Sequence, residues 1–287
     1  MKTIKSINFK EEYIREVSTR IPNEDLVNSQ FDYADNSKLT DILFIFSTPR
    51  SGSTLFSDLI FKSGLCVPHE YFQPYEYLPI LANNWDCITT DRLLNVQKFI
   101  DQLVAKRTSK NGWLGINLHG DHIALFEQFQ ERLPSVNKHF VHVIRLDTIA
   151  EAVSYEIAMQ TGQWSSHFEQ FAEPKYDFEK INHRLETINK ENTLIQSYLN
   201  LNGYNCKRVV YEEFAKNPRP FIREIIPENL IEDLNISSSM VRQSSSRNRD
   251  WIQSFSKNFV SSGGNVNDKE KRRPTCLSRI YRYFRFN

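Results

Sequence analysis

The feature that most constrains this chain is a continuous apolar run, 42–46, which leads into a stretch of hydroxyl and turn residues. An apolar run without alternation is typical of a strand buried on both faces, as in a parallel sheet. The run breaks at Ser47-Thr-Pro49, and from Gly52 the apolar residues recur at helical spacing until Gly64. The pattern therefore predicts a strand, a tight turn and a helix in direct succession.

Further segments with the apolar spacing of strands or of helices alternate along the chain. Strands are predicted at 113–118, 139–144 and 208–211, and helices from Asp147, over 177–201 and over 218–226. Strands that alternate with helices indicate an α/β fold. We expect a P-loop-like central parallel sheet flanked by helices.

Composition divides the chain into three stretches. Residues 1–40 are polar, and we expect a peripheral N-terminal extension with one short helix over 11–20. Residues 41–260 carry the alternating pattern and are predicted to form the functional domain. Residues 261–287 begin as a Ser/Gly/Asn-rich linker and end in a basic tail.

Charge, cysteine spacing and hydropathy exclude several classes of protein. The 36 Lys and Arg residues nearly balance 35 Asp and Glu residues, so a nucleic-acid-binding polyelectrolyte is excluded. The 4 cysteines lie far apart without a C-x-x-C pair, which gives neither a common zinc pattern nor a disulfide framework. The apolar runs are much shorter than the roughly 20 residues of a membrane helix, and no secretory signal is evident. We therefore expect a cytoplasmic protein with reduced thiols.

The turn after the first strand, Ser47 to Thr54 (STPRSGST), has the composition of an anion site. A strand-to-helix turn directs backbone N–H groups and a helix N-terminus at one point. Gly52 allows a ligand to approach the backbone closely, and Arg50 supplies a cation. Further donors are the hydroxyls of Ser51, Ser53 and Thr54.

This turn differs from the nucleotide-hydrolase loop G-x-x-x-x-G-K-[ST]. Ser53 stands where that loop has its lysine, and Arg50 offers the cation two residues before Gly52 instead. No strand ends in a convincing magnesium-binding acid, although Asp147 stays a candidate. The pattern favours a 5′-phosphate ligand bound without a metal ion; the alternative is a capped helix with no ligand.

A second anion site is predicted after the strand at 139–144. Arg145 follows that strand directly, and Ser154 lies on the next helix. An arginine fork with a hydroxyl is a good receptor for a phosphate monoester. In isolation, the favoured interpretation of this pair would be a surface arginine and an ordinary helical serine.

Several motifs in order resemble the sulfotransferases that use 3′-phosphoadenosine 5′-phosphosulfate (PAPS). They are TPRSGST after the buried strand, R-x-D-x-x-x-x-A-V-S from Arg145, and M-Q-T-G-Q-W after it. Within these enzymes the chain resembles the bacterial branch typified by trehalose 2-sulfotransferase. Other matching pieces are His69-Glu-Tyr-Phe72, Tyr211-Glu-Glu213 and Asn248-Arg-Asp-Trp251, so that the resemblance spans about 42–255.

The resemblance implies PAPS as co-substrate, without a metal. It assigns the 5′-phosphosulfate to Arg50, Ser51, Gly52, Ser53 and Thr54, and the 3′-phosphate to Arg145 and Ser154. Arg50 and the backbone amides would also stabilise charge on the leaving phosphate. One departure is Gly115-Ile-Asn117, where the family often has a lysine.

On the acceptor side, the resemblance assigns the general base to Glu70. His69 and His119 compete for this role, and His119 ranks second because other sulfotransferases place a catalytic histidine after a comparable strand. Aromatic and polar residues together suit a carbohydrate or glycolipid acceptor. The predicted acceptor-binding residues are Pro68, His69, Glu70, Tyr71, Phe72 and Trp85, although such aromatics are more often core.

Two rival functions stay open at this point. A nucleotide or sugar kinase would show magnesium-dependent turnover of ATP. A non-catalytic nucleotide-binding protein would bind the donor without transferring a group. The resemblance also points to a homodimer.

The tail from Lys269 to Asn287 carries seven basic residues and one acidic residue. Its apolar residues follow a helical spacing, so that one interpretation is a basic amphipathic helix on an anionic membrane surface. The other is a helix that docks its apolar face on the protein while its arginines stay solvated. The apolar residues are Leu277, Ile280, Tyr281 and Phe284.

Overall fold

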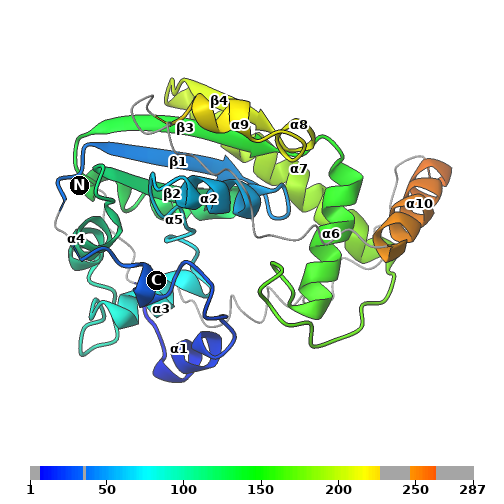
Figure 1. Cartoon of the computed structure of the whole chain (residues 1–287). Coiled ribbons are helices and arrows are strands. Elements are labelled where there is room, and N and C mark those ends of the chain that lie inside the picture. Colours follow the sequence, from blue (N-terminus) through cyan, green and yellow to red (C-terminus); the bar gives the residue numbers. More distant parts are fainter. Residues whose placement is uncertain (1–6, 35–36, 227–245, 263–287) are drawn as a thin grey trace.

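The structure is a computed structural model that describes residues 7–34, 37–226 and 246–262. Among these residues, the strands form one parallel sheet in the order β2-β1-β3-β4 (Figure 1). This arrangement confirms the predicted α/β fold with a central parallel sheet flanked by helices. The strands are β1 (Asp41–Ser47), β2 (Trp113–His119), β3 (Asn137–Ile144) and β4 (Cys206–Val210).

The helices lie between and around these strands. The α-helices are α1 (Glu11–Ser18), α2 (Ser53–Lys62), α3 (Tyr77–Asn84), α4 (Val96–Arg107), α5 (Ile123–Phe126), α6 (Thr148–Thr161), α7 (Phe178–Leu201), α8 (Tyr211–Phe214), α9 (Arg219–Arg223) and α10 (Ser246–Ser261). The short 3-10 helices are η1 (Ser29–Phe31), η2 (Gly120–His122) and η3 (Gln130–Arg132). The helix expected over 218–226 is therefore only the five-residue α9.

Strand β1 is buried on both faces, as its apolar run predicts. Leu43 and Ile45 pack with α2 and α9 in one core cluster. Phe44 and Phe46 point to the opposite face, into a larger cluster that includes residues of α3, α4 and α5. Successive side chains of a strand point to opposite faces of the sheet, so the side chains of β1 contribute alternately to the two core clusters.

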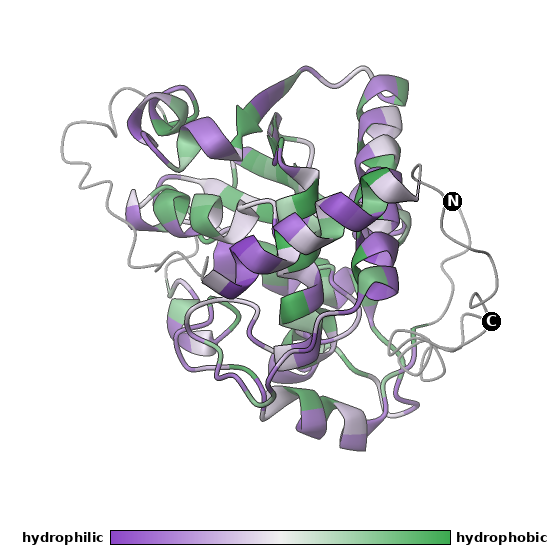
Figure 2. Cartoon of the chain, turned by 90° about the vertical axis from the view of Figure 1, so that its right-hand side faces the viewer, coloured by the Kyte–Doolittle hydropathy of each residue, from purple (hydrophilic) through white to green (hydrophobic). Residues whose placement is uncertain are grey.

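A third cluster lies beside the sheet, where α6, α7 and α10 pack together. Its centre includes Tyr155 of α6, Ile188 of α7, and Trp251 and Phe255 of α10. Figure 2 shows hydrophobic residues gathered inside the molecule and hydrophilic residues over its outer helix faces. Both α6 and α7 begin at an aspartate whose side chain accepts an N-terminal backbone N–H, as expected for helix caps.

The N-terminal stretch packs into the core, against the expectation that it is peripheral. Ile7, Phe9, Ile14, Val17 and Val27 are buried in the larger cluster. These scattered apolar residues are too few to give a clear period, which is why the sequence pattern did not reveal their burial.

Arg107, at the end of α4, holds this N-terminal stretch in place. Its guanidinium donates hydrogen bonds to the carbonyls of Leu26 (2.6 Å), Val27 (3.0 Å) and Asn28 (3.2 Å). It also pairs with Asp32 at 3.0 Å, and its side chain is fully buried. An arginine in this environment is costly without partners, so its contacts tie the stretch to α4.

The basic tail and its expected amphipathic helix lie outside the described residues. Within the part of the chain that the structure describes, no helix has both the length and the apolarity to cross a membrane.

We expect Arg107→Met to lower the free energy of unfolding by about 3–5 kcal/mol, because it removes a buried cation from Asp32 and leaves the carbonyls of Leu26 and Val27 without their donor. Arg15→Ala is the control, since the Arg15–Glu11 pair is exposed on α1 and should contribute about 0–1 kcal/mol. Urea unfolding followed by circular dichroism measures both changes. Equal small losses in the two variants would contradict the anchoring role of Arg107.

Candidate active site

Each strand of the sheet leads into a residue of the candidate site at the same edge. The anion loop follows Ser47 of β1, and His119 is the last residue of β2. Arg145 follows β3, and Tyr211 follows β4. Because the strands are parallel, their carboxyl ends bring these segments together.

The loop after β1 turns through two left-handed residues, Arg50 (φ 69°) and Gly52 (φ 101°), before α2 begins at Ser53. Position 52 requires a glycine for two reasons, its positive φ and the lack of room for a side chain. A Cβ atom there would lie 2.3 Å from Cδ2 of Tyr211. The Tyr211 ring therefore lies directly against the backbone of the loop.

Buried hydrogen bonds anchor the start of the loop. The Ser47 hydroxyl donates to Oδ1 of Asn117 on β2 at 3.2 Å, and the Thr48 hydroxyl donates to Oε1 of Glu151 on α6. Burial raises the pKa of Glu151 to about 8, so this carboxyl is mostly uncharged at neutral pH. An uncharged group beneath the loop avoids repelling an anionic ligand.

The residues of the two predicted anion sites meet around Arg50. Its Nε donates to the Ser154 hydroxyl at 3.0 Å, and its Nη1 donates to the carbonyl of Trp164. Arg145 in turn donates from Nη1 to the carbonyl of Arg50 at 3.4 Å. Burial, together with the nearby Arg145, lowers the pKa of Arg50 to about 10. Ser154 thus contacts Arg50 in this structure.

Tyr211 and Glu212 support the second of these arginines. The Arg145 guanidinium carbon lies 5.1 Å from the centre of the Tyr211 ring, a cation–π distance. Glu212 accepts the backbone N–H groups of Leu146 (3.1 Å) and Asp147 (3.0 Å). One segment after β4 therefore positions both the loop backbone at Gly52 and the Arg145 side chain.

Two donors at this site are buried and unsatisfied. Among the described residues, Ser51 Oγ and Arg145 Nε have no hydrogen-bond partner. A buried donor without a partner typically costs about 1–3 kcal/mol, so proteins rarely keep one without a function. Both donors belong to the predicted anion sites.

The segment that carries Glu70 lies along the outer edge of β2. His69 forms a parallel bridge with Ile116, and the His69 carbonyl accepts the Asn117 N–H at 2.9 Å. On its other side, His69 Nε2 lies 2.9 Å from Asp25 Oδ1, and Asp25 also accepts a bond from the Tyr77 hydroxyl. The N-terminal stretch thus fixes this segment from outside.

Glu70 lies close to the end of β2. Its Oε1 is 3.5 Å from His119 Nε2. Burial raises the pKa of Glu70 to about 7; His69 opposes this shift, and the carboxylates of Asp121 and Asp25 add to it. A carboxyl that titrates near neutral pH can accept a proton and release it again.

Burial acts in the opposite direction on two histidines near Glu70, His119 and His122. Burial lowers the pKa of His119 to about 4 and that of His122 well below its usual value. Ligand-type atoms of Glu70, His119 and His122 all lie within 4.8 Å of one another. Two more acids face this group, Asp121 and Glu191, and burial raises the pKa of both, that of Glu191 to about 9.

Three of the predicted acceptor-binding aromatics lie in the core. Tyr71 and Phe72 have no exposed surface, and Trp85 is buried against Phe99 at 5.6 Å between ring centroids. The Trp85 indole N–H donates to Asp32. Rings packed in this way cannot stack on a ligand, so the expectation that they line an acceptor site is replaced by a structural role. Pro68 is also buried, against Gly115.

Several residues of the site were missed by the sequence analysis. Asn117, Glu151 and Glu191 belong to helices or strands whose spacing shows only an ordinary pattern, so nothing in the sequence distinguishes them. Asp121 and His122 are different, because they directly follow His119 in the run His-Gly-Asp-His. Two histidines and an acid within four residues at the end of a strand were a usable signal.

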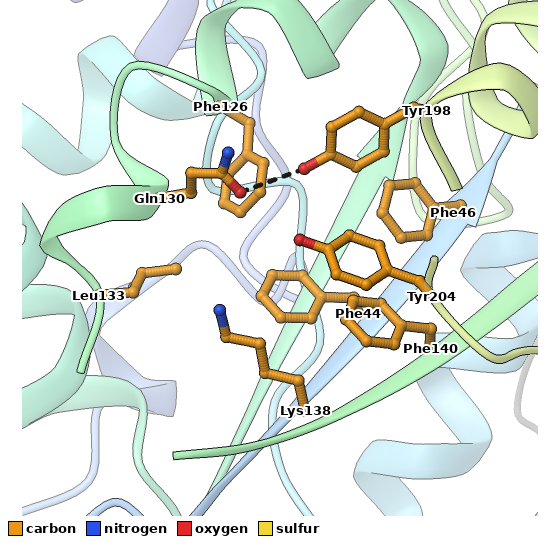
Figure 3. Close-up of a pocket in the computed structure, with 9 residues that line it drawn as sticks. All are labelled: Phe44, Phe46, Phe126, Gln130, Leu133, Lys138, Phe140, Tyr198 and Tyr204. Atoms are coloured by element: carbon orange, nitrogen blue, oxygen red, sulfur yellow. Dashed lines mark hydrogen bonds between the residues drawn. The ribbon is translucent and has the colours of Figure 1, made fainter. Parts of the chain in front are cut away.

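A separate small pocket lies against the face of the sheet that carries Phe44 and Phe46 (Figure 3). Aromatic rings from β1, β3 and α7 surround it, and the Tyr198 hydroxyl donates to Gln130 at its edge. None of the predicted site residues lines this pocket. It is therefore distinct from the candidate active site.

We expect Gly52→Ala to destabilise the protein more than Gly203→Ala does. Both glycines have positive φ, which costs an L-residue about 1–2 kcal/mol, but nothing lies within 4 Å of a Cβ at Gly203. Only at Gly52 must the Tyr211 ring also move. Chemical denaturation compares the two free energies, and equal losses would show that the ring yields without cost.

No curated protein matches the chain significantly. A sulfotransferase domain from the Synechococcus PCC 7002 olefin synthase is similar to it, with 12% identity, TM-score 0.43, and coverage of 79% of this chain and 98% of that one. A mouse sulfotransferase, SULT7A1, in complex with PAP, is similar with 15% identity, TM-score 0.38, and coverage of 96% and 94%. Residues 43–258 match the Stf0 sulphotransferase family, and the chain belongs to that family.

Proposed function

We propose that this protein transfers a sulfuryl group from PAPS to a hydroxyl of a carbohydrate or glycolipid, with Glu70 as the general base. One juxtaposition carries the proposal. The anion loop with its unsatisfied donors begins after Ser47, and Ser47 is paired with His119 across β1 and β2. His119 in turn lies 3.5 Å from Glu70. Donors suited to an anion and a carboxyl group that titrates near pH 7 therefore lie at the same edge of the sheet.

The donor would occupy the loop and the adjoining arginines. Arg50, Ser51, Gly52, Ser53 and Thr54 would bind the 5′-phosphosulfate, with backbone N–H groups at the start of α2 adding to their field. Arg145 and Ser154 would bind the 3′-phosphate. Since Ser154 contacts Arg50 in this structure, the ligand would compete with Arg50 for that hydroxyl.

The chemistry resembles phosphoryl transfer in what it demands of the protein. The acceptor oxygen attacks sulfur, the bond between sulfur and the phosphate oxygen breaks, and the hydroxyl proton passes to Glu70. Catalysis then depends on alignment of these atoms and on stabilising charge at the departing phosphate. Arg50 and the loop amides supply that stabilisation. The transferred group carries a single charge, which supports a reaction that needs no metal.

Carboxyl groups near Glu70 support a polyhydroxy acceptor. Asp121 is partly exposed and accepts a bond from the Tyr75 hydroxyl at 3.4 Å. Carboxylates accept hydrogen bonds from sugar hydroxyls, and His69 borders the same region. With Tyr71, Phe72 and Trp85 in the core, polar contacts of this kind would dominate acceptor binding.

Adenosine 3′,5′-bisphosphate should stabilise the protein against heat far more than AMP does, because it also engages Arg145. Arg145→Ala should remove most of this preference, since a charge-assisted hydrogen bond contributes about 1.5–3 kcal/mol, or roughly 10- to 100-fold in affinity. Thermal shift measures the stabilisation by each nucleotide, and calorimetric titration measures its affinity. Arg208→Ala, an exposed position on β4, is the control and should keep the preference. Equal stabilisation by the two nucleotides would refute the 3′-phosphate site.

Glu70→Gln should reduce turnover by about 10²–10⁴-fold while donor affinity changes little, because the amide keeps the shape and loses the proton acceptor. In the unmodified protein kcat/KM should rise with pH through about 7, the pKa of Glu70, as the carboxylate form appears. The assay follows labelled sulfate into a panel of sugars and glycolipids.

Glu76→Gln is the matched control for Glu70→Gln. Burial raises the pKa of Glu76 also to about 7, and the charges that act on it are those of Arg20, Asp25 and Glu70 rather than that of His119. Loss of the Glu76 carboxyl should leave turnover at the pH optimum close to normal. Normal turnover by Glu70→Gln would contradict its role.

Magnesium-dependent use of ATP would instead favour a kinase, and donor binding without transfer to any acceptor would favour a non-catalytic protein.

A further inference from the structure

A reciprocal pair of hydrogen bonds links His119 and His122 across the short helix η2. The His119 backbone N–H donates to Nδ1 of His122 at 3.1 Å. In return, the His119 ring faces the backbone N–H of His122, which completes a capping box. Each imidazole therefore accepts a hydrogen bond from the backbone of the other residue.

These two bonds define where each ring carries its hydrogen. A neutral imidazole has one N–H donor and one acceptor nitrogen. His122 accepts at Nδ1, so its hydrogen is on Nε2. Among the described residues His119 Nε2 has no hydrogen-bond partner, so the accepting nitrogen of His119 is also Nδ1 and its hydrogen is also on Nε2. Burial keeps both rings neutral.

The Nε2 atom of each ring lies near a carboxyl group of the candidate site. His119 Nε2 lies 3.5 Å from Glu70 Oε1, and His122 Nε2 lies 3.4 Å from Asp121 Oδ1. The first distance is at the outer limit of a hydrogen bond. Such bonds in a site without ligand often tighten only when the substrate binds.

From this geometry we infer that His119 is a positioning residue, whose Nε2–H holds one oxygen of the Glu70 carboxylate, with its tautomer fixed by His122. The inference rests on the proposed function, in which Glu70 is the base. One Glu70 oxygen bound by His119 leaves the other for the acceptor hydroxyl. His119 itself offers no free lone pair to that hydroxyl, so it cannot serve as the base in this tautomer.

The donated hydrogen bond also favours the charged form of Glu70. The groups that act on the Glu70 carboxyl are His69, Asp25, Glu76, Asp121, Glu191 and His119. Four of these six are acids, which disfavour a further negative charge. Removal of the His119 donor should therefore move the acid limb of the rate profile to higher pH.

The same tautomers argue against a metal ion at Glu70, His119 and His122, although their ligand atoms lie within 4.8 Å of one another. A metal binds an imidazole through a free lone pair. Here each lone pair accepts a backbone N–H. Metal binding would have to break both bonds of the capping box.

Nuclear magnetic resonance on the full-length protein tests the tautomers directly. Long-range ¹H–¹⁵N spectra of histidine-labelled protein distinguish a protonated ring nitrogen from a bare one, and His119→Gln and His122→Gln assign the signals among the 7 histidines. We expect both rings to be neutral with Nε2 protonated between pH 6 and 8, roughly the range of the assay. A His119 ring that is charged, or that carries its proton on Nδ1, would overturn the inference. So would a change of these signals on adding zinc chloride.

Two substitutions separate positioning from proton acceptance. His119→Gln retains an N–H donor but cannot act as a base, whereas His119→Leu removes both properties. If His119 positions Glu70, His119→Gln should keep turnover within about 10-fold of normal, and His119→Leu should lose more and partly recover at high pH. If His119 is the base, both should lose about 10²–10⁴-fold at every pH.

The two measurements fail independently. A protein that transfers no sulfuryl group would refute the proposed function, and the spectra would still decide the tautomers. If a His119 variant does not fold, substitution of the other histidines assigns the His119 signal by elimination, and the spectra of the unmodified protein remain the test. Transfer activity with the opposite tautomer would overturn this inference alone.

Discussion

All parts of the candidate site depend on one constraint, the edge at which the four parallel strands of the described chain end. Parallel pairing brings the carboxyl ends of the strands together, so each strand delivers its following residues to the same place. The loop after Ser47, the histidine that ends β2, and Arg145 and Tyr211 after the other strands owe their proximity to it. None of these residues is near another in the sequence.

The features predicted best from the sequence are those that depend on local periodicity. The strand at 42–46, the loop after it and the position of Arg145 after a strand all follow from short patterns, and the structure contains them. Such patterns do not show which residues contact each other when they are far apart in the sequence. The contact between Arg50 and Ser154 depends on how α6 packs, and the burial of Trp85 depends on the N-terminal stretch. Side-chain orientation is decided by tertiary packing, which residue type alone does not reveal.

Charge at this edge is arranged unevenly. Arg50 and Arg145 lie at the loop, while the carboxyl groups of Glu70, Asp121 and Glu191 gather around the end of β2. Burial raises the pKa of all three acids, that of Glu191 to about 9, which limits repulsion among them. The site thus separates a region suited to an anion from a region suited to proton transfer, and the distinction arises from burial as much as from residue type.

The anchoring of the N-terminal stretch has a consequence for how the chain folds during synthesis. Residues 7–33 find their backbone partners at Arg92, Leu94 and Lys106, and Asp25 finds His69. A ribosome adds about 5–20 residues each second, so residues 7–33 wait several seconds for the segments that cover them. During that interval their apolar side chains are exposed to chaperones and proteases. This stretch is therefore made well before the partners that give it its native surroundings.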